Sequence, residues 1–182
     1  MSPEFGTEAF AALYREHRDH VFRYAYRMFG SVEPAEDATH DCFLSLWKRP
    51  GRYDPARASL RVYFYAAVRN LVRKRFRDLG REVAAEEVPA QAVNGNDGDP
   101  LRGLLDQELA EAVGRAVLAL PPLQREVVVL FEYEELSLAE IASIVEADVG
   151  TVKARLHRAR QGLRRMLTPP ASREEMEENR SE

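Results

Sequence analysis

The most suggestive chemistry in this sequence lies in a run of positive side chains in its last third. Residues 149–167 hold one Lys and five Arg but no Asp or Glu, although the whole chain has a net charge of −4. A helix with only positive charges can lie against the phosphates of nucleic acid, and its first turns can reach base edges in the DNA major groove. The residue types favour a contact with duplex DNA. A solvated basic face on an ordinary helical hairpin is the alternative.

The segment before this run has the features of the supporting helix of a helix-turn-helix. Ser137 and Glu140 fit the Ser-x-x-Glu capping box, in which each side chain satisfies a backbone N–H at a helix start. Asp148 can cap the following helix, which we expect over 149–167. The short turn between the two helices contains Glu146 in a region where Gly is common.

We expect the basic helix to meet DNA in two ways. Base edges are within reach of its N-terminal half, where Thr151, Lys153 and Arg155 lie. Phosphates are within reach along its outward face. The outward face and its flanks consist of Lys153, Arg155, His157, Arg158, Arg160 and Arg164.

A second basic helix, expected over 60–78, combines positive charge with aromatic rings. Tyr63, Phe64 and Tyr65 precede its polar and basic residues. Aromatic faces beside positive charge suit single-stranded DNA, because unpaired bases stack while the phosphates are neutralised. Three consecutive aromatics sweep about 200° around a helix, so at least one belongs to the core. The polar and basic residues are Arg69, Asn70, Arg73, Lys74, Arg75 and Arg77.

A helix expected over 34–47 has a different character. One stripe of it, at steps of three and four residues, consists of Asp37, His40, Asp41 and Leu44. An acidic and apolar helix is a poor surface for negatively charged DNA, so a protein partner fits it better. An ordinary solvated face explains the stripe equally well.

Helical periodicity runs through nearly the whole chain, and strand signals are almost absent. Residues 82–111 carry eight acidic side chains and one basic side chain, which separates the basic segments on either side. We therefore predict an all-α fold of two small helical domains. The predicted segments are a first domain over 6–80, a flexible acidic linker over 81–100, a helix-turn-helix domain over 101–168 and a disordered acidic tail over 169–182.

Enzyme chemistry has no support among the residues. The four histidines and Cys42 lack the spacing of a zinc site, and no Gly-rich phosphate loop or nucleophile elbow is present. We expect no catalytic residues, no metal site and no cofactor. No apolar run approaches the roughly 18 residues of a membrane span, and no signal pattern is visible, so we expect a cytoplasmic protein without direct membrane insertion.

Together, these segments resemble those of the extracytoplasmic-function (ECF) sigma factors, small subunits of bacterial RNA polymerase. DATHDCFLSLW (Asp37–Trp47) is similar to the family's D-x-x-Q-E-x-F-x-x-x-W segment, with His40 for Gln and Asp41 for Glu. YFYAAVRN (Tyr63–Asn70) is similar to its W-L-x-x-I-A-x-N segment. Residues 120–163 resemble the family's second domain nearly throughout, and GTVKARLHRAR is a specific match.

The resemblance implies a sigma factor that binds core RNA polymerase, directs it to the −35 and −10 elements of promoters and assists promoter melting. It implies contacts with the clamp of the largest polymerase subunit and with the flap of the second-largest subunit, besides promoter DNA. It also implies an anti-sigma factor, which in many family members is anchored in the membrane and can hold the sigma factor there.

The resemblance also assigns residues to these roles. The −35 element would contact Thr151, Lys153, Arg155 and Arg158, together with His157 of the same outward face. Recognition and melting of the −10 element would use Arg52, Arg57, Tyr63, Tyr65, Arg69, Asn70, Arg73, Lys74 and Arg77. The polymerase clamp would bind Asp37, His40, Asp41, Leu44 and Trp47. Tyr63 stands where Trp is usual and Lys74 where Asp is common, which makes this helix more basic than is typical.

Two other functions are compatible with the residues. A free-standing helix-turn-helix regulator would act as a dimer and bind a palindrome without polymerase. A structural adaptor would use the basic helices to bind protein or RNA. Comigration with core polymerase and promoter-specific initiation would distinguish the sigma factor from both.

Overall fold

The computed structural model describes residues 6–78 and 100–168, with side chains in 6–78 and 108–168. Within these ranges every regular element is a helix or helical turn, which confirms the predicted all-α fold. None of the helices in this part of the chain is long and apolar enough to cross a membrane. The predicted tail over 169–182 and nearly all of the predicted linker over 81–100 lie outside the described residues.

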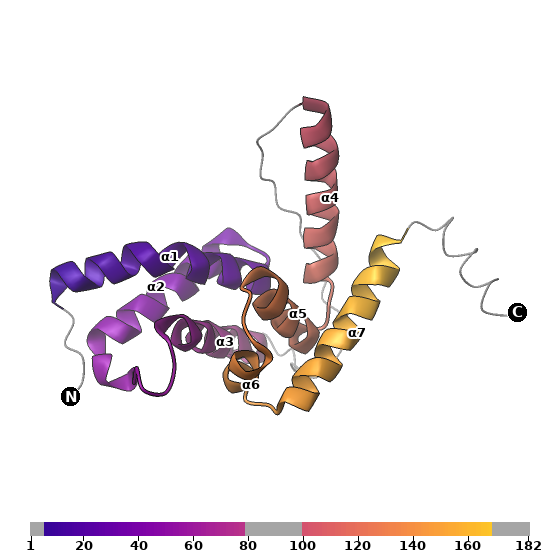
Figure 1. Ribbon diagram of the computed structural model, residues 1–182. Coiled ribbons are helices and arrows are strands. Elements are labelled where there is room, and N and C mark those ends of the chain that lie inside the picture. The colour runs from indigo at the N-terminus through magenta and orange to yellow at the C-terminus, as the bar shows by residue number, and fades with distance from the viewer. Residues whose placement is uncertain (1–5, 79–99, 169–182) are drawn as a thin grey trace, which may run out of the picture.

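The N-terminal half is a group of three helices around an apolar core (Figure 1). Its elements are α1 (Thr7–Phe29), α2 (Val32–Lys48), the 3-10 turn η1 (Pro50–Arg52) and α3 (Leu60–Asp78). Helix α1 ends at Gly30, whose φ of 76° is left-handed and whose amide donates to the Tyr26 carbonyl at 2.7 Å. Glycine adopts this conformation without strain, so it closes α1 and lets α2 fold back on it. The bounds of α3 agree with the predicted helix over 60–78.

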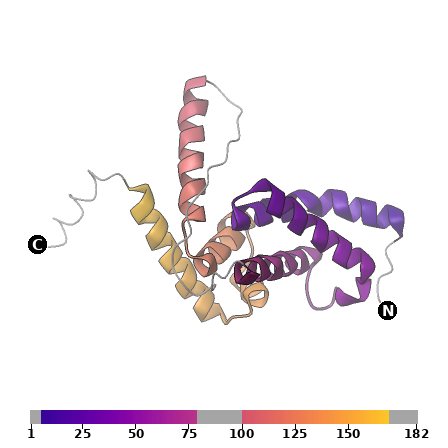
Figure 2. The same ribbon diagram turned by 180° about the vertical axis from the view of Figure 1, so that it is seen from behind.

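The C-terminal half contains helices and one widened turn. Its elements are α4 (Pro100–Leu118), α5 (Pro122–Val128), the π-helical turn η2 (Val129–Tyr133), α6 (Leu138–Val145) and α7 (Val149–Leu167). Both views show α4 projecting from the body that the other elements form (Figures 1 and 2). Helix α7 packs on α4, α5 and α6, and its bounds are the predicted ones.

The helix-turn-helix of α6 and α7 forms as the sequence predicts. The Ser137 amide donates to the Glu140 carboxylate at 2.9 Å, and the Glu140 amide donates to the Ser137 hydroxyl at 3.2 Å. The Asp148 carboxylate accepts a hydrogen bond from the Thr151 amide at 2.8 Å, so the second predicted cap is also confirmed. The turn includes Glu146 at a φ of 52°, a left-handed conformation that costs a residue with a side chain roughly 1–2 kcal/mol.

The two halves pack directly on each other. Helix α3 contacts α6, while α1 contacts α4, α5 and η2, and the buried apolar side chains of both halves form one continuous core. Arg125 of α5, which is 2% exposed, donates to the Met28 carbonyl of α1 at 2.8 Å. Its other hydrogen bonds go to the carbonyls of Leu118 and Leu120. Burial lowers the pKa of Arg125 to about 10, so the guanidinium that joins these segments stays charged at neutral pH.

A buried ion pair lies between α3 and α5. The Nε atom of Arg69 is 2.9 Å from a carboxylate oxygen of Glu126, and the two residues are 4% and 3% exposed. Arg69 also donates to the Val145 carbonyl of α6 at 2.8 Å. Burial raises the pKa of the Glu126 carboxyl from 4.5 to about 7, although the positive charges of Arg69, Arg155 and Arg73 act in the opposite direction.

Replacing Ser137 with Ala should destabilise the folded protein by about 1 kcal/mol, because the Glu140 amide loses its acceptor at the start of α6. The midpoint of thermal unfolding measures this loss. Ser143, exposed within the same helix, provides the matched control, and Ser143→Ala should leave the midpoint nearly unchanged. Equal losses in the two variants would contradict the role of the cap.

Replacing Glu126 with Gln should change how stability depends on pH. Because its pKa is raised in the folded protein, the stabilising contribution of Glu126 is complete below a pH of about 4.5 and is lost as pH rises through about 7. The thermal midpoint of the wild type should therefore fall relative to that of Glu126→Gln across this range. Thermal unfolding at several pH values measures the difference, and Glu132→Gln, which removes an exposed carboxylate of the same half, is the control. A constant difference between wild type and Glu126→Gln would contradict this expectation.

Candidate nucleic-acid and polymerase interfaces

Helix α7 presents positive charge to solvent. Three of the five residues predicted to contact the −35 element are exposed on it, namely Lys153, His157 and Arg158. Thr151 is partly buried, and its hydroxyl donates to the Asp148 carboxylate at 2.7 Å, so this side chain belongs to the helix cap. The charge and shape of the exposed face match the phosphates and major groove of duplex DNA.

Arg155 differs from its neighbours on α7. It is partly buried, its Nη1 atom is enclosed by protein, and its positive charge acts on the buried Glu126 carboxyl. The side chain thus lies toward α5 as well as toward solvent. Arg160, on the outward face, forms an ion pair with Glu132 at 2.7 Å. The predicted basic face therefore contains residues that are already in contact with protein.

The residues predicted to contact the −10 strand fall into three groups by their exposure to solvent. The exposed group comprises Arg52, Arg57, Asn70, Arg73, Lys74 and Arg77. Tyr63 is partly buried, and its ring meets that of Tyr53 edge-on with centroids 5.5 Å apart. Tyr65 and Arg69 form the buried group, at 0% and 4% exposed. The predicted strand-binding surface is therefore only partly open.

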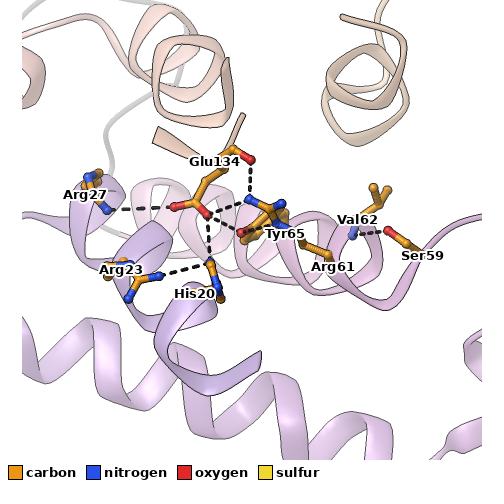
Figure 3. Close-up of polar contacts among 8 residues, drawn as sticks. All are labelled: His20, Arg23, Arg27, Ser59, Arg61, Val62, Tyr65 and Glu134. Atoms are coloured by element: carbon orange, nitrogen blue, oxygen red, sulfur yellow. Dashed lines mark hydrogen bonds and ion pairs between the residues drawn. The ribbon is translucent and has the colours of Figure 1, made fainter. Parts of the chain in front are cut away.

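Glu134, which follows η2, encloses Tyr65. Its carboxylate lies between α1 and α3, where it accepts a hydrogen bond from the Tyr65 hydroxyl (Figure 3). Arg61 donates to the backbone carbonyl of Glu134 and lies 3.4 Å from its carboxylate. His20 and Arg27 of α1 lie 3.7 and 3.9 Å from the same carboxylate. Burial raises the pKa of Tyr65, so its hydroxyl remains protonated and donates.

Arg69 is enclosed by the same half of the protein. Besides Glu126 and the Val145 carbonyl, it contacts the Glu146 carboxylate at 3.3 Å, in the turn of the helix-turn-helix. Neither Tyr65 nor Arg69 can touch a DNA strand while the halves pack in this way. Their contact with DNA stays a prediction, and both residues are buried in the packed arrangement.

The residues predicted to bind polymerase lie on two different sides of helix α2. His40, Leu44 and Trp47 line an apolar groove of about 480 Å³ between α1 and α2. Trp47 is 43% exposed there, which is unusual for so large an apolar ring. Asp37 and Asp41 line a separate polar pocket that faces α3. The structure thus brings three of the five residues together and places the two carboxylates beside a different helix.

The sequence reasoning missed the residues that join the two halves. Arg125, Glu126 and Glu134 lie in and after a short helix, and Arg61 stands among the first residues of α3. Their contacts are with partners far away in the chain, so no local spacing marks them. Among the residues that the structure describes, no group of His, Cys, Asp and Glu could hold a metal ion.

Comparison with protein families matches both halves. Residues 13–82 match the model of Sigma-70 region 2, and residues 110–163 match that of Sigma-70, region 4. The chain is 35% identical over 170 residues to the ECF RNA polymerase sigma factor SigW of Bacillus subtilis, covering 88% of this chain and 89% of SigW. It is 33% identical over 162 residues to the ECF RNA polymerase sigma factor SigE of Mycolicibacterium smegmatis, covering 88% of this chain and 62% of SigE.

Solved structures share the fold. The sigma factor RpoE, in its complex with the anti-sigma factor NepR from Bartonella quintana, superposes with a TM-score of 0.69 at 22% identity, covering 88% of this chain and 98% of RpoE. CnrH, in complex with the cytosolic domain of CnrY, gives a TM-score of 0.60 at 25% identity over 89% of each chain. These findings favour a sigma factor over a free-standing regulator. The chain belongs to the ECF sigma factors of the sigma-70 family, the RNA polymerase subunits that recognise promoters and start transcription.

Proposed function

We propose that the second half, with the bounds 101–168, reads the −35 element through α7. The main support is a helix-turn-helix with capped helices whose second helix exposes Lys153, His157 and Arg158. The first turns of such a helix enter the major groove, where Arg and Lys reach guanine edges. Arg155 contributes from the margin of this surface, since it also lies toward α5.

The first half, with the bounds 6–80, opens and captures the −10 strand. Arg73, Lys74 and Arg77 supply exposed positive charge along α3, and the partly exposed ring of Tyr63 supplies a stacking surface. Stacking and phosphate neutralisation together offset the free energy of unpairing bases. The loop residues Arg52 and Arg57, also exposed, extend the charge beyond the start of α3, while the exposed Asn70 supplies an amide.

The groove between α1 and α2 serves as the main polymerase contact. His40, Leu44 and Trp47 offer an apolar surface to the clamp of the largest subunit, while Asp37 and Asp41 add negative charge on the side of α2 that faces α3. The flap of the second-largest subunit contacts the second half. Burial of an exposed aromatic ring such as Trp47 is a common source of binding energy at protein interfaces.

The proposed mechanism contains no catalytic step by this protein, and it requires neither a metal nor a cofactor. Sigma factors work with polymerase on the chromosome, so we place this one in the cytoplasm. An anti-sigma factor, in some cases anchored in the membrane, is a further proposed partner. The presence of NepR on RpoE, a protein of the same fold, supports this partner class.

Transcription in vitro tests the proposed function as a whole. Core polymerase is mixed with the purified protein and a pool of genomic fragments, and the start sites are mapped. We expect initiation from a set of promoters with shared −35 and −10 elements. Tight binding of the protein alone to a palindrome, without any polymerase association, would instead support a free-standing regulator.

Replacing Arg158 with Ala should weaken recognition of the −35 element, because one specific base contact is worth roughly 1–3 kcal/mol. Binding of the reconstituted holoenzyme to duplexes from the mapped promoters measures the effect. Arg115→Ala removes an exposed charge from α4, away from the proposed surface, and is the matched control. Unchanged binding by Arg158→Ala would remove this residue from the −35 interface.

Replacing Asp41 with Arg should impair association with core polymerase, because the substitution reverses a charge at the edge of the proposed docking surface. The same variant should keep its affinity for a −35 duplex, since Asp41 lies in the other half. Comigration with core enzyme and duplex binding are measured on one preparation. Asp19→Arg, an equal reversal at an exposed site on α1, is the control. Normal polymerase capture by Asp41→Arg would show that the docking surface lies elsewhere.

A further inference from the structure

We propose that Ala154 is a specificity-determining residue of α7, which selects a thymine in the −35 element by contact with the 5-methyl group of that base. The proposal depends on the −35 role assigned to α7 above. It adds a base that the promoter must contain and the side chain that recognises it. The residues predicted to contact the −35 element are all polar or charged, and Ala154 is not among them.

Several polar side chains near the start of α7 already have partners within the protein. The Thr151 hydroxyl donates to the Asp148 carboxylate at 2.7 Å. Arg155 is partly buried, and its Nη1 atom is enclosed by protein. The Nε2 atom of His157 lies 3.0 Å from the Nε2 atom of Gln161, on the next turn. Each of these side chains must give up a protein contact before it can bind a base edge, which weakens its claim to read the sequence.

The exposed residues of the same part of α7 are Lys153, Ala154 and Arg158. Lys153 and Ala154 are neighbours in the chain, and Arg158 follows Ala154 by four residues, so it lies one turn further along the same face of the helix. Lys and Arg side chains are long enough to reach guanine edges and phosphates. When these two bind DNA, the short side chain between them faces the base pairs directly.

The chemistry of an alanine side chain decides which base it favours. Its methyl group neither donates nor accepts a hydrogen bond, and thymine alone presents a methyl group in the major groove. Contact between the two methyl groups removes both from water, which is favourable. The amino group of cytosine or adenine in the same place would lose water without gaining an acceptor, which is unfavourable. Ala154 therefore favours thymine at this position and disfavours bases with an amino group there.

Replacement of thymine by deoxyuridine tests the contact, because deoxyuridine lacks only the 5-methyl group. Duplexes are made from the mapped promoters with each thymine of the −35 element replaced in turn, on either strand, and binding of the reconstituted holoenzyme is measured. At one thymine the replacement should weaken binding roughly fourfold, the effect of leaving one methyl group without its contact. The position of that thymine identifies the base that Ala154 faces.

Ala154→Gly removes the other methyl group of the same contact. The variant should bind the thymine and deoxyuridine duplexes equally well at the position where the wild type distinguishes them. Because the two duplexes are compared within one variant, any general effect of Gly on the stability of α7 cancels. Ala110→Gly, the same change at an exposed residue of α4, is the matched control and should keep the wild-type preference for thymine.

Ala154→Ser is a second variant that retains a side chain at this position. Its hydroxyl group can donate to or accept from the edges of different bases, so the preference for thymine should relax at this one position. A loss on replacing thymine that persists in Ala154→Gly would assign the methyl contact to another residue and overturn the proposal. Equal binding of all the thymine and deoxyuridine duplexes by the wild type would also overturn it, as would −35 elements without an A·T pair.

A further variant separates failure of this proposal from failure of the proposed function. Replacing both Lys153 and Arg158 with Ala removes the exposed charges that flank Ala154. If the holoenzyme of this double variant binds the −35 duplexes as tightly as the wild type, the −35 role of α7 fails. If the double variant binds them more weakly while no thymine shows a loss that depends on Ala154, only the thymine contact fails.

Discussion

Four charged side chains are buried where the two halves meet, and the arrangement of the molecule depends on how they are satisfied. Arg69, Arg125, Glu126 and Glu134 are each exposed by 4% or less. Burying a charged side chain costs desolvation free energy, and the attraction within a buried ion pair often does no more than offset that cost. Such an interface fixes the relative position of the halves without adding much stability.

Apolar and polar contacts together join the two halves. Their buried apolar side chains form one continuous core, and α3 adds polar contacts with the second half at Tyr65 and Arg69. Core polymerase can contact α2 through the groove at Trp47, on a side of the first half that the second half does not cover. The proposed polymerase contact at this groove is therefore compatible with the packed arrangement of the halves.

The sequence predicts those features of the structure that depend on residues close together in the chain. The caps at Ser137 and Asp148, the bounds of α3 and α7, and the exposure of Lys153 and Arg158 all follow from residues within one or two helical turns. The same reasoning does not reveal burial that distant residues cause. Tyr65 and Arg69 are buried in contact with Glu134 and Val145, which stand 69 and 76 positions away in the chain.

Smaller errors have the same origin. Met166 fits the inward stripe of α7 by periodicity, but it is 41% exposed because it lies in the last turn of the helix, beyond the packed body. By helical periodicity the buried stripe of α6 consists of Leu138, Ile141, Ala142 and Val145. Ile144 falls outside this stripe and is nonetheless buried, since α6 is covered by α3 as well as by α7. A periodic pattern identifies one buried face of a helix, whereas a short helix between two neighbours has two.

Glu146 shows how the turn of the helix-turn-helix is joined to the first half. Glu146 has a left-handed backbone conformation, which Gly would adopt with less strain. Its side chain is exposed, and ion pairs at exposed side chains contribute little to stability, so the pair with Arg69 does not offset this strain. Stability therefore does not account for a carboxylate here. Its position does, because it connects the turn before α7 to the buried guanidinium of α3. Arg69 thereby joins helix α3 both to the turn of the helix-turn-helix and to the end of α6.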